Sequence, residues 1–113
     1  MKIDRTEKAP AAIMLGIGCS SRISVNAVRR LNLKEGERID IVIADSVYLK
    51  FGDRGYKLRL TDYDAALYFS DAAISREVVK HFGLDRKIRN LFAIADEPEE
   101  MEGKQLWKIS PMP

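Results

Sequence analysis

The sequence contains very few of the residues that metal sites and many catalytic sites need. Its 113 residues include one cysteine, Cys19, and one histidine, His81. A structural zinc site usually needs about four cysteine or histidine ligands, and a disulfide needs a second cysteine. The composition therefore predicts no disulfide, no metal, no cofactor and no enzymatic activity. The single cysteine also favours a reducing, cytoplasmic location.

Long apolar runs are missing as well. No segment approaches the ~20 apolar residues that a membrane-spanning helix needs. The N-terminal stretch MKIDRTEKAP lacks the apolar run of a secretion signal, so neither a leader nor a membrane segment is expected. The content of 46% hydrophobic and 32% charged residues is instead typical of a globular protein. The length predicts a single domain, residues 1–113.

Charge is distributed unevenly along the chain. Five acidic residues lie in the stretch DEPEEMEG, residues 96–103, and the net charge changes from +2 to +7 when they are set aside. A body this basic suits a polyanionic partner, although Lys and Arg on an ordinary solvated surface explain it equally well. The acidic stretch is predicted to be a solvated hairpin loop. The alternatives are a mimic of DNA or an autoinhibitory flap over the basic surface.

A segment of 23 residues occurs twice without a gap, 51 positions apart. Residues 23–45 read ISVNAVRRLNLKEGERIDIVIAD, and residues 74–96 read ISREVVKHFGLDRKIRNLFAIAD. The identical positions fall on helix caps, apolar positions and a strand: Ile23/Ile74, Ser24/Ser75, Val28/Val79, Leu33/Leu84, Arg38/Arg89, Ile43/Ile94, Ala44/Ala95 and Asp45/Asp96. This pattern predicts two structural repeats, residues 11–60 and a diverged second copy at residues 61–113.

Each copy predicts a short helix, a turn and a strand. Ser24 suits the start of the first helix, because its hydroxyl can accept from the free N–H groups of the first turn. Asn32 suits the end of that helix, where the left-handed conformation is common. The alternating run at residues 38–44 then predicts a half-buried strand. Ser75 and Gly83 occupy the same places in the second copy.

The strand of the second copy is predicted at residues 89–95, and further strands are predicted around the two copies at residues 11–17, 65–70 and 105–110. Residues 47–60 predict a hairpin, because two alternating runs are joined by Gly-Asp-Arg-Gly. Each half then reads strand, helix, turn, strand, strand. The expected fold is α+β and mostly β, with two βαββ-type halves that form a small pseudo-twofold barrel.

The string ISVNAVRRLNLKEGERIDIVIADSVYLKF, residues 23–51, resembles the AbrB/SpoVT/MazE-like swapped-hairpin domain. The matching features are Ile23-Ser24 at a strand end, a short helix bearing arginine, Leu31-Asn32-Leu33, a turn with Gly36, and a strand. The resemblance covers the first copy and, more weakly, the second. It implies a barrel in which two halves, usually from two chains, exchange hairpins. It also implies duplex DNA binding through basic residues near the second strand and the helix start.

The sequence departs from the family pattern at three places. Ser24 stands where a proline usually begins the helix, Glu37 replaces an aspartate, and Lys87 lies opposite Gly36 in the second copy. Double-psi barrels, in which one chain supplies both halves, share a similar signature. The chain is therefore expected to form either a swapped-hairpin or a double-psi-like barrel, as an internal pseudo-dimer or as a homodimer.

Two groups of basic residues are candidates for contact with nucleic acid. In the predicted hairpin, alternation turns the apolar or aromatic residues Val47, Leu49, Phe51, Tyr56, Leu58 and Leu60 inward. It places Tyr48, Lys50, Lys57 and Arg59 outside, where cations beside an aromatic ring suit phosphate contact and base stacking. A charged edge that prevents aggregation of sheets explains the same residues. The resemblance places Arg22 and Arg29 in the region that meets DNA. The complete candidate set is Arg22, Arg29, Arg30, Lys34, Arg38, Tyr48, Lys50, Lys57 and Arg59.

These observations lead to the hypothesis of an AbrB-like transcription regulator or an antitoxin-type DNA-binding protein. One alternative is a protein-interaction or assembly module built on the same barrel. Another is single-stranded nucleic acid binding through the basic hairpin. A steep salt dependence of binding distinguishes nucleic-acid binding from a protein module, and a preference for single strands distinguishes the last alternative from duplex binding.

Overall fold

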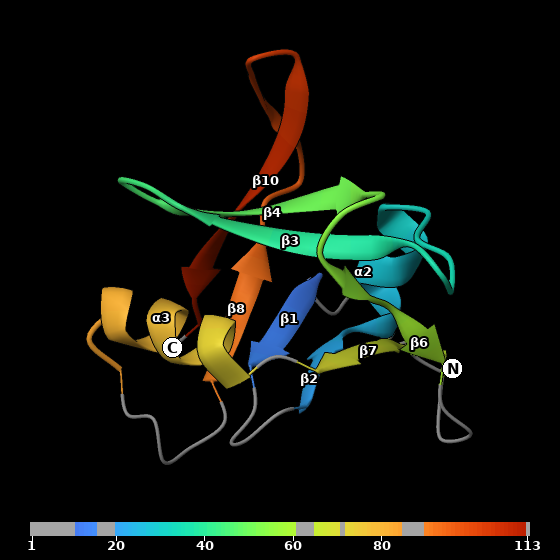
Figure 1. Cartoon of the computed structure of the whole chain (residues 1–113), viewed down its shortest axis with the longest axis horizontal. Helices are drawn as coiled ribbons and strands as arrows, with labels where there is room; N and C mark the ends of the chain where they lie inside the picture. Colours follow the sequence, from blue (N-terminus) through green and yellow to red (C-terminus); the bar gives the residue numbers. More distant parts are fainter. Residues whose placement is uncertain (1–10, 16–19, 61–64, 71, 85–89, 113) are drawn as a thin grey trace, which may run out of the picture.

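The computed structural model describes residues 11–15, 20–60, 65–70, 72–84 and 90–112 (Figure 1). Residues 16 and 17 of the first predicted strand, Cys19, Lys87 and the N-terminal stretch lie outside the described residues. Within those ranges, no helix is long and apolar enough to cross a membrane. The helices are α2 (Val25–Arg30) and α3 (Ala72–His81). The strands are β1 (Ala12–Leu15), β2 (Ser20–Ile23), β3 (Arg38–Ile43), β4 (Val47–Gly52), β5 (Tyr56–Lys57), β6 (Arg59–Leu60), β7 (Leu67–Ser70), β8 (Asn90–Ile94), β9 (Glu99–Met101) and β10 (Lys104–Pro111).

The strands form a nearly closed antiparallel sheet. Its order is β5-β3-β4-β10-β8-β1-β2-β7-β6, and the two ends, β5 and β6, are separated in the chain by Leu58 alone. The Leu58 N–H donates to the Glu37 carbonyl at 2.8 Å, and the Leu58 carbonyl accepts from the Gly36 N–H at 3.0 Å. Residues 56–60 therefore bridge from β3 to β7 and curl the sheet into a barrel. The expectation of a mostly β, barrel-like fold is confirmed.

Alternation along the strands fills the barrel with apolar side chains. Inward residues are buried while their neighbours face outward, as the two-residue period of a strand requires. Phe69 and Phe92 are the largest fully buried side chains, and α2 and α3 add the fully buried Ala27 and Val78. Burying one such large apolar side chain contributes about 1.5–3 kcal/mol. The barrel interior is therefore the main source of stability.

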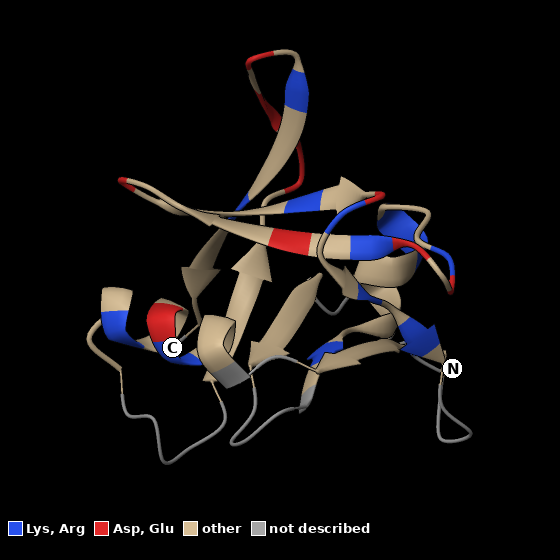
Figure 2. Ribbon diagram, viewed as in Figure 1, with Lys and Arg blue, Asp and Glu red and all other residues tan. Residues whose placement is uncertain are grey.

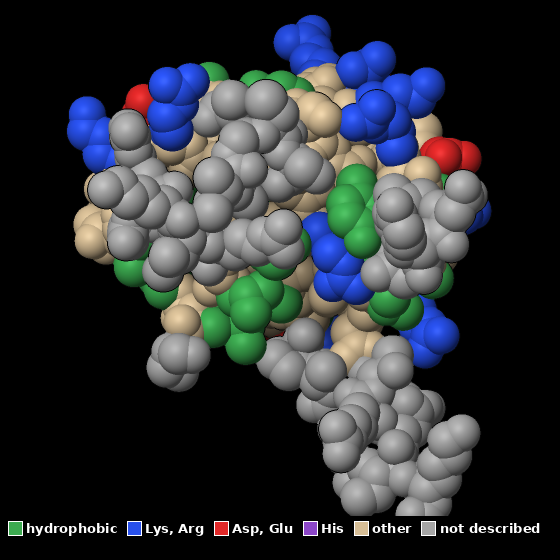
Figure 3. All heavy atoms as spheres, turned by 90° about the horizontal axis from the view of Figure 1, so that it is seen from below, with side chains coloured by type: hydrophobic (Ala, Val, Ile, Leu, Met, Phe, Trp, Pro, Cys, Tyr) green, Lys and Arg blue, Asp and Glu red, His purple; other side chains and the backbone are tan. Residues whose placement is uncertain are grey.

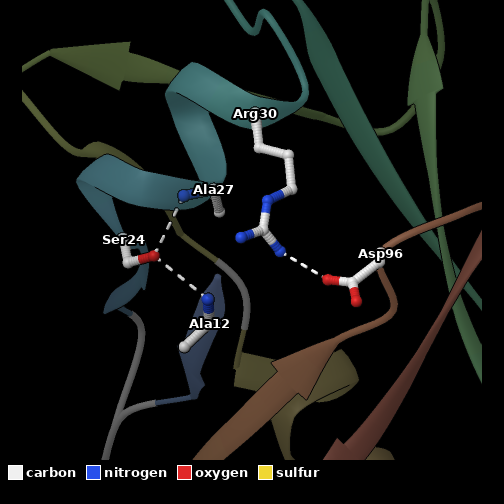
Figure 4. A network of polar contacts seen from close by, with 5 residues as sticks. All are labelled: Ala12, Ser24, Ala27, Arg30 and Asp96. Atoms are coloured by element: carbon white, nitrogen blue, oxygen red, sulfur yellow. Dashed lines mark hydrogen bonds and ion pairs between the residues drawn. The ribbon is translucent and has the colours of Figure 1, made fainter. Parts of the chain in front are cut away.

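Ser24 begins α2, as the sequence predicts. Its hydroxyl accepts from the Ala27 N–H at 3.2 Å and from the Ala12 N–H of β1 at 3.0 Å (Figure 4). The Ser24 N–H in turn donates to the Ala12 carbonyl at 2.9 Å. Asn32 follows the helix with a φ of 53°, which confirms the predicted left-handed stop. One serine side chain thus attaches the start of the helix to a barrel strand.

Replacing Ser24 with alanine is expected to lower the free energy of unfolding by about 1–2 kcal/mol. The change removes a helix cap and leaves the Ala12 N–H without its acceptor. Urea unfolding measures the loss, and Ser110→Ala is the matched control because Ser110 is an exposed serine in β10. Equal stability of the two variants would show that the Ser24 hydroxyl has no structural role.

The predicted cap at Ser75 is wrong. Helix α3 begins at Ala72, so Ser75 lies inside the helix rather than before it. The Ser75 side chain is 4% exposed, and its Oγ lies 3.2 Å from Oγ of the buried Ser21 in β2. Its hydroxyl therefore contributes to a contact between a helix and a strand. Gly83, with a φ of 68°, does match Asn32 in position and conformation.

The predicted hairpin of residues 47–60 is also wrong. Strand β4 pairs with β3, whereas β5 pairs with the opposite edge of β3, so Arg38 faces Gly52 on one side and Lys57 on the other. In Figure 1 the connecting loop passes in front of β3. Gly55 makes this crossing with a φ of +102°, and a Cβ there would lie 2.1 Å from the carbonyl oxygen of Ile39. Only glycine allows so close an approach.

The acidic stretch forms the end of a hairpin, as predicted, but part of it is strand. Residues Glu99–Met101 pair with Lys104–Leu106, and the turn residues Glu102 and Gly103 both have positive φ. This hairpin projects from the barrel, with acidic residues along it (Figure 2). Because it points away from β5 and β6, the arrangement does not favour an acidic flap over the surface of those strands.

Candidate nucleic-acid interface

Cross-strand neighbours on the outer surface bring several predicted cations together. Arg22 of β2 faces Tyr68 of β7, and Tyr68 faces Arg59 of β6. Paired residues of antiparallel strands project on the same face, with Cβ atoms about 5 Å apart. The residues on either side of Tyr68, Leu67 and Phe69, are buried inside the barrel. The arginine-tyrosine-arginine row therefore lies on the outside.

Specific contacts fix the side chains of this row. Arg22 Nε donates to Tyr68 Oη at 3.2 Å, and the Arg22 guanidinium carbon lies 6.0 Å from the centre of the Tyr68 ring. Arg59 Nη2 donates to Ser70 Oγ at 2.8 Å. Arginine carries five N–H donors in a planar group, so Arg59 can use others to bind an anion. The row thus presents one guanidinium group on each side of a tyrosine, and hydrogen bonds fix the position of both groups.

Residues 56–60 extend the row into a belt. Lys57 and Arg59 project on the same side, about 7 Å apart, because Leu58 between them is fully buried. Lys57 faces Arg38 of β3, and Arg38 Nη1 donates to the Gly55 carbonyl at 2.8 Å. Arg38, Lys57, Arg59 and Arg22 are together defined as the cationic belt. Of the described charged side chains seen in Figure 3, most are Lys or Arg.

Lys50 belongs to a second group of cations, with Lys104 and Arg54. It faces Asp40 across the β3–β4 pair. The positive charge of the neighbouring Lys104 lowers the pKa of Lys50, desolvation and Arg54 add to this effect, and Asp40 opposes it. Repulsion between two adjacent ammonium groups favours the neutral form of one of them. An anion placed between these cations would relieve that repulsion.

Replacing Lys104 with glutamine is expected to raise the pKa of Lys50, because it removes the positive charge that lowers this pKa most. The opposite change is expected from Asp40→Asn, which removes a carboxylate that raises the pKa of Lys50. A pH titration of the Lys50 side chain by NMR measures both. Since a bound polyanion favours the charged form, affinity should fall as pH rises through the lowered pKa. An unchanged Lys50 titration in Lys104→Gln would contradict the proposed contact.

Tyr48 does not belong to the interface. It is 8% exposed, although it was predicted to lie on an outer hairpin face. The reason is that β4 is a central strand: Tyr48 has Val42 of β3 on one side and Lys108 of β10 on the other. The prediction for Leu60 fails in the opposite direction. Leu60 was predicted to face inward, but it is 50% exposed.

The remaining candidates lie apart from the belt. Arg29 and Arg30 occupy the last turn of α2, where cations favour the helix dipole. Arg30 Nη1 forms an ion pair with Asp96 Oδ1 at 2.6 Å (Figure 4). Lys34 is exposed, at the start of the loop whose residues Gly36 and Glu37 pair with Leu58. These cations are accessible, but no lateral pairing joins them to the belt among the residues described.

Comparisons of the chain with protein families, with curated proteins and with solved structures gave no match. In the described part of the chain, no group of three or more His, Cys, Asp or Glu side chains is placed to hold a metal ion. The feature with the clearest chemical meaning is the cationic belt.

Proposed function

We propose that the chain binds nucleic acid through the cationic belt. The observation that carries this proposal is the lateral pairing of Arg38 with Lys57 and of Arg59 with Tyr68 and Arg22. Phosphate contacts by Lys and Arg supply nearly all of the affinity of non-specific nucleic-acid binding, and strong binders make roughly 6–10 of them. The belt together with Lys50, Lys104 and Arg54 offers enough cations for that range.

We also propose that the fold consists of two related halves supplied by one chain. The first half is β1-β2-α2-β3-β4, and the second is β5/β6-β7-α3-β8-β10, each with one strand more than the expected βαββ unit. The boundary between the halves then lies between β4 and β5, at residues 53–55, rather than after residue 60. The strands before the helices, β2 and β7, pair with each other, and so do the last strands, β4 and β10. This symmetric pairing supports a pseudo-twofold barrel and an internal duplication.

The AbrB-like identity remains part of this proposal. Ser24 has a φ of −60°, which is close to the value that the proline usual in that family would require. The backbone angle therefore fits the family pattern, whereas the bond from the Ser24 N–H to the Ala12 carbonyl is one that proline could not make. An AbrB-like transcription regulator or antitoxin-type DNA-binding protein is the function that this fit and the cationic belt support best. The belt would dock on phosphates, with specificity added by other side chains or by DNA shape.

A protein-interaction module is the second candidate, and the projecting β9–β10 hairpin favours it. Every residue from Glu99 to Gln105 is exposed, so this hairpin is accessible to a partner. The two functions can coexist on one barrel, because the hairpin points away from β5 and β6 (Figure 1).

Fluorescence anisotropy with labelled duplex and single-stranded DNA of mixed sequence tests the proposal. The logarithm of the binding constant should fall linearly with the logarithm of the salt concentration, with a slope of about −3 to −4 if four belt cations contact phosphates of a duplex. A lack of binding to both DNA forms at low salt would exclude the nucleic-acid function and favour the protein-interaction module.

A further inference from the structure

The row that contains Arg22 continues beyond the cationic belt. Arg22 also faces Met14 of β1, and Met14 faces Leu91 of β8. One row of outward residues therefore crosses five neighbouring strands, from Leu91 through Met14, Arg22 and Tyr68 to Arg59. Adjacent strands are about 4.8 Å apart, so the row is roughly 19 Å long. One of its ends is cationic and the other is apolar.

The apolar end of this row is accessible. Leu91 is 49% exposed, and Met14 is partly exposed, while their strand neighbours Ile13, Leu15 and Phe92 are buried in the barrel. Single exposed leucines are common and need no explanation. The informative feature is that Leu91 and Met14 lie in the same row as a tyrosine between two arginines. This combination suits a ligand that is anionic on one side and flat and apolar on the other.

We propose that this row is a base-contacting surface for single-stranded nucleic acid, an inference that rests on the proposed function. Arg22 and Arg59 bind phosphates, and the unpaired bases lie against Tyr68, Met14 and Leu91. A duplex keeps the faces of its bases stacked inside, whereas an unpaired strand can place them on the side chains of a sheet. The cationic belt contacts the phosphates of either form, and the row adds contacts with bases only when the strand is unpaired. A single strand is therefore expected to bind more tightly than a duplex of the same charge.

The test compares anisotropy of one labelled single-stranded oligonucleotide with that of its duplex, for the wild type and for substitutions in the row. The wild type should bind the single strand more tightly. Tyr68→Ala should weaken single-strand binding about tenfold, the usual effect of removing one stacked side chain, and leave duplex binding within about twofold. Tyr68→Phe should keep most of the affinity, because it keeps the ring and loses only the Oη contact with Arg22.

Leu91→Ser provides a second variant that does not touch the arginines. It should weaken single-strand binding severalfold. Leu60→Ser is the matched control, because Leu60 is 50% exposed and lies outside the row. Thermal unfolding of each variant confirms that the barrel remains folded. Loss of binding in both Tyr68→Ala and Tyr68→Phe would assign Tyr68 only to the positioning of Arg22 and would overturn the inference.

The failure of this inference can be told apart from failure of the proposed function. Binding of both DNA forms that Tyr68→Ala and Leu91→Ser leave unchanged would overturn the inference and keep the proposed function. Absence of binding to either form would overturn both. In that case a labelled peptide of alternating glutamate and leucine serves as the probe. Binding that Leu91→Ser abolishes would then assign the row to an acidic, apolar protein segment.

Discussion

Gly55→Ala is expected to lower the free energy of unfolding by about 3 kcal/mol or more, since backbone strain and overpacking each cost about 1–3 kcal/mol. The added Cβ would lie 2.1 Å from the carbonyl oxygen of Ile39 and 2.7 Å from its carbonyl carbon. Both are backbone atoms of a strand that is paired on its two edges, so they cannot move aside as a flexible side chain would. The φ of +102° is a second cost for any residue with a Cβ.

Two other glycines separate the steric cost from the conformational cost. Gly36 has a φ of +95° with no atom within 4 Å of a Cβ, so Gly36→Ala should show the conformational cost alone, about 1–2 kcal/mol. Gly52 has neither feature, so Gly52→Ala should change stability by less than about 0.5 kcal/mol. Urea unfolding of the three variants measures the series. Equal losses in Gly55→Ala and Gly36→Ala would show that the chain does not pass so close to β3.

The crossing at Gly55 also shows where prediction from the sequence ends. Alternation in residues 47–60 correctly predicts that Val47, Leu49 and Leu58 face inward, because the two-residue period of a strand is a local property. It does not determine which strand lies alongside. A Gly-Asp-Arg-Gly turn reads the same whether the chain returns beside β4 or crosses β3. The partner is determined by contacts between residues far apart in the sequence, such as Gly55 with Ile39.

The candidate interface likewise contains residues that the local sequence pattern predicts and residues that it misses. The sequence predicts all four residues of the belt, Arg22, Arg38, Lys57 and Arg59. Predicting that a charged side chain faces outward requires only the local pattern and the resemblance. Tyr68 was missed, although its position between the apolar Leu67 and Phe69 marks it as outward-facing. Its place between two arginines depends on the register of three strands, and a shift by one residue would turn each side chain to the other face. No local pattern contains that register.

Lys104 was missed for a related reason. It follows the turn of the projecting hairpin, in a stretch that the sequence marks as acidic rather than basic. Its contact with Lys50 depends on β10 packing beside β4, which joins the last strands of the two repeats. When each repeat is considered alone, the sequence places the two lysines in different halves. The structure makes them neighbours.

Removing two belt charges is expected to have the largest effect on binding. Lys57→Gln combined with Arg59→Gln should weaken nucleic-acid binding about 100-fold at roughly 50 mM salt, because each phosphate contact contributes about 0.7–0.9 to the slope of log affinity against log salt. The slope itself should decrease in magnitude by nearly 2. Both residues are exposed, so the barrel should remain folded. Anisotropy titrations across salt measure the affinity and the slope together.

The matched control is Arg76→Gln combined with Lys80→Gln on α3. It removes the same charge from the chain, but α3 lies on the opposite side of the barrel from β6 (Figure 1). The control should therefore change affinity by less than about threefold, since long-range attraction between exposed charges is largely screened beyond ~10 Å at 0.1 M salt. If both double variants weaken binding equally, the attraction belongs to the net charge of the chain. A selective loss with the belt variant requires that phosphates contact Lys57 and Arg59 directly.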